Sequence, residues 1–265
     1  MIAAIWVLVF FSILSLGVYA IVSAQLRLAR AFEERLTAPY LAKSAALSAQ
    51  AQRASDKTQY DTLYTLQQTH GREMGDGAFT YRIVDEERRI NLNASNTDTL
   101  SRLPGFTAEI AQRIGEYPHK PFHATEELRL LDGVTEAVFA QCHEYVTVFG
   151  QGRVNINTAG PQVLSALGLD DGLIQLIQGF RSGPDGEEGT EDDGAFEAAG
   201  SILETLRQYR ALTTDQETQL VSLQGVLTVL SENLALQIST TLREKPALKY
   251  EIVIDQKAVK SFKEL

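Results

Sequence analysis

The hydrophobic pattern of the chain changes sharply once, close to its start. Residues 1–25 contain no charged side chain, and the first charge is carried by Arg27. An α-helix rises about 1.5 Å per residue, so roughly 20 apolar residues cross the hydrocarbon core of a bilayer. The three serines of this stretch can bond back to helix carbonyls and do not interrupt it. The pattern therefore predicts a membrane-spanning helix over residues 1–25.

Two other interpretations of this segment stay open. A cleaved signal peptide would use the small residues before Gln25, but the apolar run is longer than a usual signal core and no basic stretch stands before it in this sequence. A plain signal anchor conflicts with the charges, because Arg27, Arg30 and Arg35 all follow the span. By the positive-inside rule, these arginines would place the rest of the chain in the cytoplasm.

Helical periodicity continues beyond the span. Leu28, Phe32 and Leu36 recur every four positions, so they share one face of a helix. Pro39 is expected to kink this helix or to start a new helical segment. We expect residues 26–74 to form an amphipathic continuation of the first helix, ended by the Gly-Asp-Gly triplet that follows. Its apolar face requires a partner surface.

Strand-like alternation begins directly after this helix. Apolar and polar residues alternate over 79–84, and the acidic segment 85–88 has the composition of a turn. Residues 90–92 then look like a second short strand. These patterns predict a strand pair within residues 75–92.

The matching strands are expected at the far end of the chain. Period-two alternation over 234–241 and 248–254, across the polar turn 244–246, predicts a hairpin. The predicted fold is therefore α+β, with a long N-terminal helix packed on a small antiparallel sheet made by residues 75–92 and 225–265. The sequence between these parts has mostly helical periodicity, so we expect a large helical domain, residues 93–224, inserted between strands.

The inserted domain contains an internal repeat. Residues 89–95, Arg-Ile-Asn-Leu-Asn-Ala-Ser, recur 64 positions later as 153–159, Arg-Val-Asn-Ile-Asn-Thr-Ala. Each copy precedes an amphipathic helix, so its Asn, Ser and Thr side chains are expected to cap that helix. A repeat of this length predicts two similar helical units that pack together.

Composition narrows the possible functions. The chain has 265 residues, 44% of them hydrophobic, which is enough for a membrane segment and one or two packed domains. Its formal net charge of −10 argues against a nucleic-acid partner, because phosphate binding depends on Lys and Arg. Cys142 is the single cysteine, so no internal disulfide can form.

Two segments resemble the hairpin of helix-hairpin-helix modules. Residues 103–107 and 131–135 each place a glycine before an apolar residue, between helix-like segments. In such modules a Gly-apolar-Gly loop offers backbone N–H groups to a nucleic-acid phosphate, but here Thr107 and Thr135 replace the second glycine. Residues 91–150 also carry four Lys or Arg against eight Asp or Glu. We interpret this region as a helical scaffold that keeps the hairpin shape, and expect no nucleic-acid binding.

The segment 183–194 is the strongest candidate site. Six carboxylates fall within nine residues, among glycines that allow tight turns. Such dense like charge should keep the loop open unless a hard divalent cation, which takes six to eight oxygen ligands, folds it. The acid spacing differs from an EF-hand, and a solvated acidic loop is the alternative. The predicted calcium ligands are Asp185, Glu187, Glu188, Thr190, Asp192 and Asp193.

Zinc and catalysis have little support. Pro121 separates His119 from His123, and the adjacent Cys142 and His143 would point apart on a helix. The sequence also lacks a Gly-x-Ser-x-Gly elbow, a phosphate-binding Gly-rich loop and a His-Glu-x-x-His motif. We therefore expect a protein that is not an enzyme.

In their order along the chain, these features resemble the protein K family of minor pseudopilins in type II secretion systems. The resemblance spans nearly the whole chain. It rests on the apolar N-terminal helix and on the segments 81–86, 90–93, 154–159, 185–193 with Phe196, and 227–229.

The resemblance implies a pseudopilin fold with a large inserted domain that holds calcium, although the ligands are not matched residue by residue. It implies a single-pass protein of the bacterial inner membrane with most of its chain in the periplasm. There it would stand at the pseudopilus tip with the minor pseudopilins I, J and H, above the major pseudopilin. Its role would be structural: to help initiate the pseudopilus that exports folded proteins.

Members of this family are made with a short basic leader that prepilin peptidase removes, followed by methylation. Met1 would then be the mature first residue or a late start codon, and a lost leader would explain the charge distribution around the span. Most pseudopilins have Glu at mature position five, whereas protein K typically does not, and Ile5 stands here. The alternative function is a membrane-anchored helix-hairpin-helix DNA receptor of the competence type.

Overall fold

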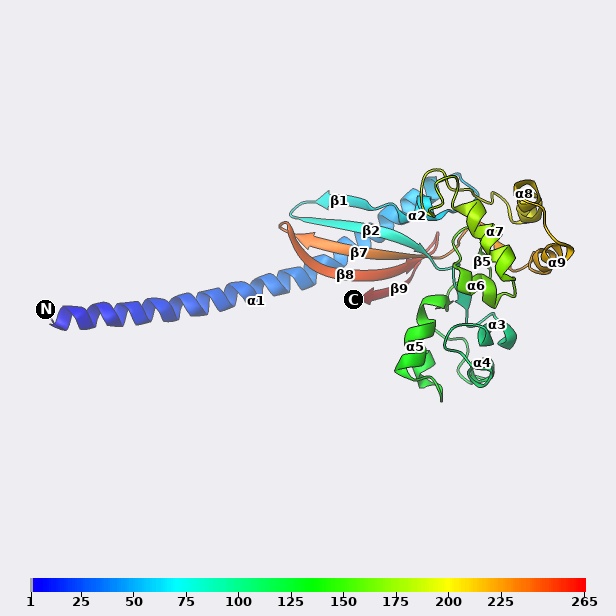
Figure 1. Ribbon diagram of the computed structural model, residues 1–265. Helices are drawn as coiled ribbons and strands as arrows, with labels where there is room; N and C mark the ends of the chain where they lie inside the picture. Colours follow the sequence, from blue (N-terminus) through cyan, green and yellow to red (C-terminus); the bar gives the residue numbers. More distant parts are fainter. Residues whose placement is uncertain (1) are drawn as a thin grey trace.

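The structure is a computed structural model that describes residues 2–265. Met1, on which the prediction about the mature N-terminus depends, lies outside the described residues. A long helix, α1 (Ile2–Ser55), projects from an antiparallel sheet, and a mostly helical region lies at the far end of that sheet. Figure 1 shows the N-terminal half of α1 free of the rest of the molecule.

The first part of α1 has the character of a membrane anchor. Its most apolar 18-residue window has a mean hydropathy of 2.5, and none of that window is buried. Trp6, Leu8 and Phe10 are each more than 60% exposed, a state that is unfavourable in water. By length and composition, the predicted span over residues 1–25 is thus consistent with a single-pass anchor.

The second part of α1 packs on the sheet through small side chains. Ala38, Ala42, Ala45, Ala46 and Ala49 are all buried against it. This face is mostly alanine, with Leu41 as its large buried side chain, so the helix axis can approach the strands closely. The predicted partner sheet is present, but the predicted apolar face is wrong. Leu28, Phe32 and Leu36 are 59–67% exposed, because they lie on the part of α1 that precedes the sheet or points away from it. The helix is continuous through its proline, so the alternative of a new helical segment there is wrong.

The predicted helical extent up to residue 74 is wrong. Helix α1 ends at Ser55, and a short helix, α2 (Leu63–Gln67), follows a loop. The Asp56 carboxylate accepts a hydrogen bond from the Thr58 amide, an Asx turn that competes with helix continuation. Residues 70–74 form a strand, and Gly75, with φ of 59°, reverses the chain within a hairpin instead of ending a helix.

The main sheet has five strands in the described part of the chain, and all neighbours are antiparallel. Their order is β1-β2-β7-β8-β9. The strands are β1 (His70–Met74), β2 (Gly77–Asp85), β7 (Leu234–Leu242), β8 (Lys245–Ile254) and β9 (Val259–Glu264). The C-terminal hairpin is confirmed, although its turn is Arg243-Glu244, with φ of 50° and 64°. Strand β9 was not predicted, because its sequence has the composition of a charged tail.

The predicted strand at 90–92 does not belong to this sheet. Strand β3 (Ile90–Asn91) pairs in parallel with β4 (Val146–Thr147), inside the inserted region. Strand β5 (Val154–Asn155) pairs in the same way with β6 (Leu227–Thr228). The insertion therefore fills the whole interval between β2 and β7, and is wider than residues 93–224.

The two parallel strand pairs confirm the predicted repeat. The two strands of each pair are the first and the last element of one unit. Unit 1 is residues 90–147, and unit 2 is residues 154–228. Unit 1 contains α3 (Thr97–Ser101), α4 (Ala108–Gly115), η1 (Thr125–Leu130), α5 (Glu136–Cys142) and η2 (His143–Tyr145). Unit 2 contains α6 (Pro161–Ala166), α7 (Asp171–Arg181), η3 (Ala199–Ser201), α8 (Ile202–Tyr209) and α9 (Thr214–Ser222).

The prediction that the repeated asparagines cap the following helices is wrong. Asn93 accepts a hydrogen bond from the Phe122 amide at 2.7 Å and donates one to the Phe122 carbonyl at 3.0 Å. Asn157 makes the same two bonds to Phe196, both at 2.9 Å. A side-chain amide can pair with a peptide group in this way because it carries a donor and an acceptor side by side. The repeat thus fixes one phenylalanine in each unit.

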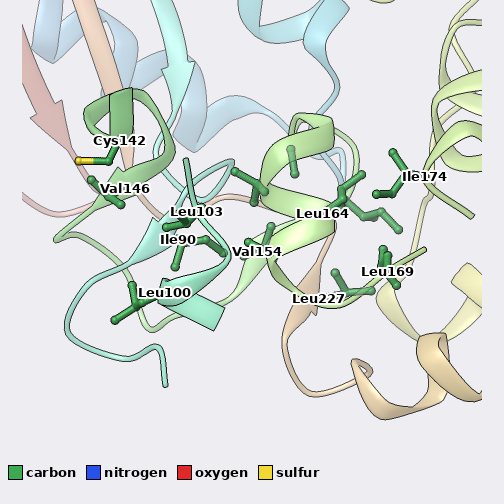
Figure 2. Packing of buried hydrophobic residues seen from close by; sticks show 14 of the residues in the cluster. Ile90, Leu100, Leu103, Cys142, Val146, Val154, Leu164, Leu169, Ile174 and Leu227 are labelled. Atoms are coloured by element: carbon green, nitrogen blue, oxygen red, sulfur yellow. The ribbon is translucent and has the colours of Figure 1, made fainter. Parts of the chain in front are cut away.

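A single apolar core joins the two units. Leu100 and Leu164, which are equivalent in the repeat, are at most 1% exposed. Figure 2 shows Ile90 and Leu103 of unit 1 close to Val154 of unit 2, with Leu164 beyond them. The shared core makes the inserted region one packed body.

Candidate functional site

The helix-hairpin-helix shape is present in both units. Gly105, Gly133 and Gly168 have φ of 81°, 90° and 97°, and each lies in a turn between two helical segments. Only glycine adopts this backbone without strain. The first two hairpins were predicted. The third hairpin, residues 167–170, was not predicted. Its glycine, Gly168, stands 63 positions after Gly105 instead of the 64 positions that separate the two copies of the repeat.

One amide in the helical turn after each hairpin already has a side-chain partner within the chain. The side chains of Thr107, Thr135 and Asp170 accept hydrogen bonds from the amides of Ile110, Val138 and Leu173, respectively. Each helix also carries an acidic residue in its first turn. These carboxylates occupy the place at a helix N-terminus where a phosphate would be attracted.

The acidic loop 183–194 is held together by its own hydrogen bonds. The Thr190 hydroxyl donates to Asp192 at 2.8 Å, which lowers the pKa of that carboxyl, and it lies 3.2 Å from an Asp193 oxygen. The Asp185 carboxylate accepts from the Glu187 amide at 2.8 Å. The Asp185 amide donates to Asp192 at 3.3 Å. Five of the six predicted ligands are thus linked within one loop.

Glu188, the sixth predicted ligand, pairs with a buried arginine, while its own side chain stays 28% exposed. Its carboxylate lies 3.0 Å from the Arg181 guanidinium, which is 97% buried and also donates to the carbonyls of Ile156 and Ala159. Burial lowers the pKa of Arg181. The sequence analysis missed this arginine, although an isolated cation at the end of a helix before six acids is a recognisable signal. The Arg181–Glu188 ion pair therefore links the acidic loop to the core of unit 2.

The donor set of the loop suits calcium chemically, since it consists of carboxylate and hydroxyl oxygens. The oxygen atoms of the loop, however, do not surround one common point as the ligands of a bound ion would. Within residues 2–265, no three His, Cys, Asp or Glu side chains are gathered closely enough to hold a metal ion. The same holds for the histidines and the cysteine weighed for zinc, and Cys142 is buried with its pKa raised to about 11 by desolvation. Calcium in the acidic loop stays a prediction.

A second group of acidic residues lies where the sheet meets the insertion. We call Asp85, Glu86 and Glu87 the acidic junction; all three are at most 4% exposed. The Asp85 carboxylate accepts from Asn155 and Thr158 of unit 2. The three carboxylates of the acidic junction accept hydrogen bonds from different parts of the chain.

Glu86 and Glu87 extend these connections. Glu86 accepts from the Thr147 hydroxyl of unit 1. Glu87 accepts from the Asn233 amide at 3.1 Å and from the Asn233 side chain at 2.8 Å, just before β7. The acidic junction therefore connects β2, both units and β7. From the sequence this segment looked like a surface turn, and the turn is present, but its carboxylates are buried.

An ion pair connects α1 to the same region. The Arg53 guanidinium donates two hydrogen bonds to Asp61, and one to the Ser231 carbonyl at 2.9 Å. The Ser231 amide in turn donates to Asp61 at 2.8 Å. Helix α1, its following loop and the segment before β7 are thus fixed together.

The buried environment shifts the protonation of two carboxyl groups of the acidic junction. Burial raises the pKa of Asp85. Burial and the nearby Asp85 charge raise the pKa of Glu87 from 4.5 to about 8. Asp85 and Glu87 therefore bind protons more readily than surface carboxylates do, which makes the contacts they form sensitive to pH.

A family of known proteins matches the hairpin region of unit 1. The helix-hairpin-helix motif family matches residues 85–147, which is unit 1 with the acidic junction before it. Endonuclease/exonuclease/phosphatase family domain-containing protein 1 from Xenopus laevis is 28% identical over 126 residues, 38% of this chain and 23% of that protein. The protein of the same name from Homo sapiens is 26% identical over 147 residues, 43% of this chain and 26% of that protein. The chain thus spans about a quarter of the length of these curated relatives.

Comparison of structures covers much more of the molecule. A chain in the crystal structure of the GspK-GspI-GspJ complex of the type 2 secretion system, from enterotoxigenic Escherichia coli, aligns with a TM-score of 0.62 at 19% identity. The alignment covers 89% of this chain and 97% of that chain. The predicted α+β pseudopilin fold, with its inserted helical region, is confirmed.

Proposed function

We propose that this chain is a minor pseudopilin of the protein K type, which helps initiate and cap the pseudopilus of a type II secretion system. The observation that carries the proposal is the fold match, which covers 89% of this chain and 97% of the aligned chain. The role is structural.

The parts of the chain suit this role. The apolar start of α1 anchors the protein in the inner membrane, with the sheet and insertion in the periplasm. After α1 leaves the bilayer, its outer face still exposes Leu36, Tyr40 and Leu47, each at least 66% exposed. An apolar stripe of this kind on a helix favours packing against neighbouring helices. The minor pseudopilins I, J and H, with the major pseudopilin below, are the proposed neighbours, and prepilin peptidase is the proposed processing enzyme.

This proposal predicts co-purification of the full chain with the minor pseudopilins I and J from membranes of cells that express all three. The paired change Leu36→Glu with Tyr40→Glu should abolish co-purification, because it places charges on the apolar stripe without altering the core. The matched control, Thr58→Glu with Gln59→Glu, adds the same charge in the loop after α1 and should leave the complex intact. Failure of the unmodified chain to co-purify would overturn the proposal.

Calcium binding by the acidic loop belongs to the same proposal. Calcium at about 100 times its dissociation constant would stabilise the fold by about 2.7 kcal/mol, so chelation should lower the melting temperature by several degrees. Asp192→Asn should remove the response to chelator, whereas Asp215→Asn, an exposed acid of α9, should retain it. Circular dichroism melts with calcium and with chelator measure both. Identical melting curves would show that the loop holds no calcium.

The hairpin matches support one alternative, a membrane-anchored DNA-binding protein. The family match to unit 1 favours it, while the capped amides and the acidic charge of that unit oppose it. We expect the full chain in detergent to leave the mobility of a fluorescent DNA duplex unchanged at low salt. A shift that disappears at high salt would revive this alternative, because phosphate contacts are salt-dependent.

A further inference from the structure

Comparison of the two units with each other shows one difference in how their aromatic residues are covered. In unit 1, Tyr117 stacks on Phe122 with ring centroids 4.5 Å apart. In unit 2, Phe180 packs on Phe196 at 4.7 Å. Tyr117 and Phe180 lie at the same distance after the cap residues of α4 and α7, so the two aromatic pairs occupy equivalent places.

In unit 2 a third aromatic residue covers this pair. Tyr209 packs edge-on against Phe180 at 5.5 Å, and its hydroxyl donates to the Gly179 carbonyl at 2.9 Å. Tyr209 is the last residue of α8 and stands four residues before Thr213, the cap of α9. In unit 1, Leu131 stands four residues before Thr135, the cap of α5. Unit 1 therefore has a smaller, non-aromatic side chain at the position of the covering tyrosine.

Beside Tyr117 and Leu131, unit 1 has an open hollow of about 530 Å³. Its walls are Tyr117, Pro118, His119, Leu130 and Leu131. His119 lies edge-on to Tyr117 at 5.6 Å, and Leu130 at the end of η1 is 73% exposed. Apolar walls of this size that no aromatic ring of the chain covers favour contact with a partner.

The charges at the rim specify the partner further. Arg113, Glu116 and Asp132 surround the hollow, and the Arg113 guanidinium bonds to the Asp132 backbone carbonyl. In the part of the chain that the structure describes, neither rim carboxylate takes part in an ion pair. In unit 2, the covering Tyr209 is followed by Arg210.

We propose that the unit 1 hollow is a docking site for a partner protein, which inserts an aromatic side chain that stands beside a basic residue. The ring would take the place against Tyr117 that Tyr209 takes against Phe180. The neighbouring cation would face Glu116 and Asp132. This inference concerns the insertion alone and stands independently of the pseudopilus proposal.

The test uses the full chain in nanodiscs and a small probe, the amide of N-acetyl-3-fluorotyrosyl-arginine, observed by fluorine NMR. Binding should broaden the probe signal beyond that seen with empty nanodiscs. The matching fluorotyrosyl-glutamate probe should bind about tenfold more weakly, because its charge repels the rim. Equal binding of both probes, or no binding of either, would refute the proposal.

Two substitutions locate the binding. Leu130→Trp fills the hollow from its exposed wall and should weaken probe binding about tenfold, because the ring can no longer be buried. Val221→Trp adds a ring at a site of α9 that is 52% exposed and should leave binding unchanged. Circular dichroism verifies that both variants are folded. Undiminished binding to the Leu130→Trp chain would place the probe elsewhere and contradict the proposal.

A third variant tests the role of the rim charges. Tyr209→Ala opens the corresponding place in unit 2, where Gly179 and Arg210 stand at the positions of Glu116 and Asp132, and should therefore leave the number of bound tyrosyl-arginine probes at one per chain. A second bound probe would show that the rim carboxylates do not select the partner and would contradict the proposal.

Discussion

Replacing Asp85 by alanine is expected to lower the free energy of unfolding by about 3–5 kcal/mol. The change removes a buried acceptor that serves Asn155, Thr158 and the Glu87 amide. These donors would remain buried without a partner, and each unsatisfied group costs about 1–3 kcal/mol. Urea unfolding of a fragment that starts at residue 27, followed by circular dichroism, measures the loss.

Asp76→Ala is the matched control for this prediction. The Asp76 side chain is 78% exposed in the β1–β2 turn and makes only a distant ion pair. We expect its removal to change the free energy of unfolding by less than about 0.5 kcal/mol. If Asp85→Ala proves equally neutral, the acidic junction is not the connection between sheet and insertion that its hydrogen bonds indicate.

Stability should also fall as the pH rises from about 5 to 8. The pKa of Glu87 is raised from 4.5 to about 8 in the folded chain, so the folded state binds this proton more tightly than the unfolded state. The resulting stabilisation is fully present below pH 4.5 and is lost as the pH rises towards 8. We expect a loss of a few kcal/mol, since one pKa unit corresponds to about 1.4 kcal/mol.

The variant Glu87→Gln should remove most of this pH dependence, because glutamine is neutral throughout the range. Glu144→Gln, at an exposed position of η2, should keep the pH dependence of the unmodified chain. Urea unfolding at pH 5, 6, 7 and 8 compares the three proteins. A Glu87→Gln chain whose stability still declines with the slope of the unmodified chain would show that another group is responsible.

Together, these contacts make the insertion continuous with the sheet. Asp85 ends β2 and binds unit 2, Glu86 binds unit 1, and Glu87 binds the segment before β7. The Arg53–Asp61 pair adds α1 to the same connection. The insertion is therefore linked to α1 through buried polar contacts, as the proposed place at the tip of a pseudopilus requires.

Much of this architecture could be predicted from local patterns. The uncharged run at the start, the four-residue spacing from Leu28 to Leu36 and the strand alternation of the last hairpin depend only on which side chains face water. The 64-residue repeat predicted two units because each copy must bury the same apolar face. The N-terminal helix, the sheet hairpin and the duplicated insertion follow from these patterns.

Other features depend on contacts between distant residues. The helix ends at Ser55, and residues 70–74 form a strand, because β2 offers an edge with which they can pair. Ile90 lies outside the main sheet because Val146, 56 positions later, is its partner. Periodicity contains no information about either pairing.

The apolar run, the long N-terminal helix, the repeat and the acidic loop could all be recognised without the fold, because each depends on the composition of one continuous segment. The environment of the acidic residues could not, because it depends on contacts between distant segments. Asp85, Glu86 and Glu87 have the composition of a surface turn, yet they are buried because donors from both units and from β7 converge on them. Glu188 pairs with the buried Arg181, although its own side chain stays 28% exposed. Burial of a charge depends on its distant partners, and only the folded chain brings those partners together.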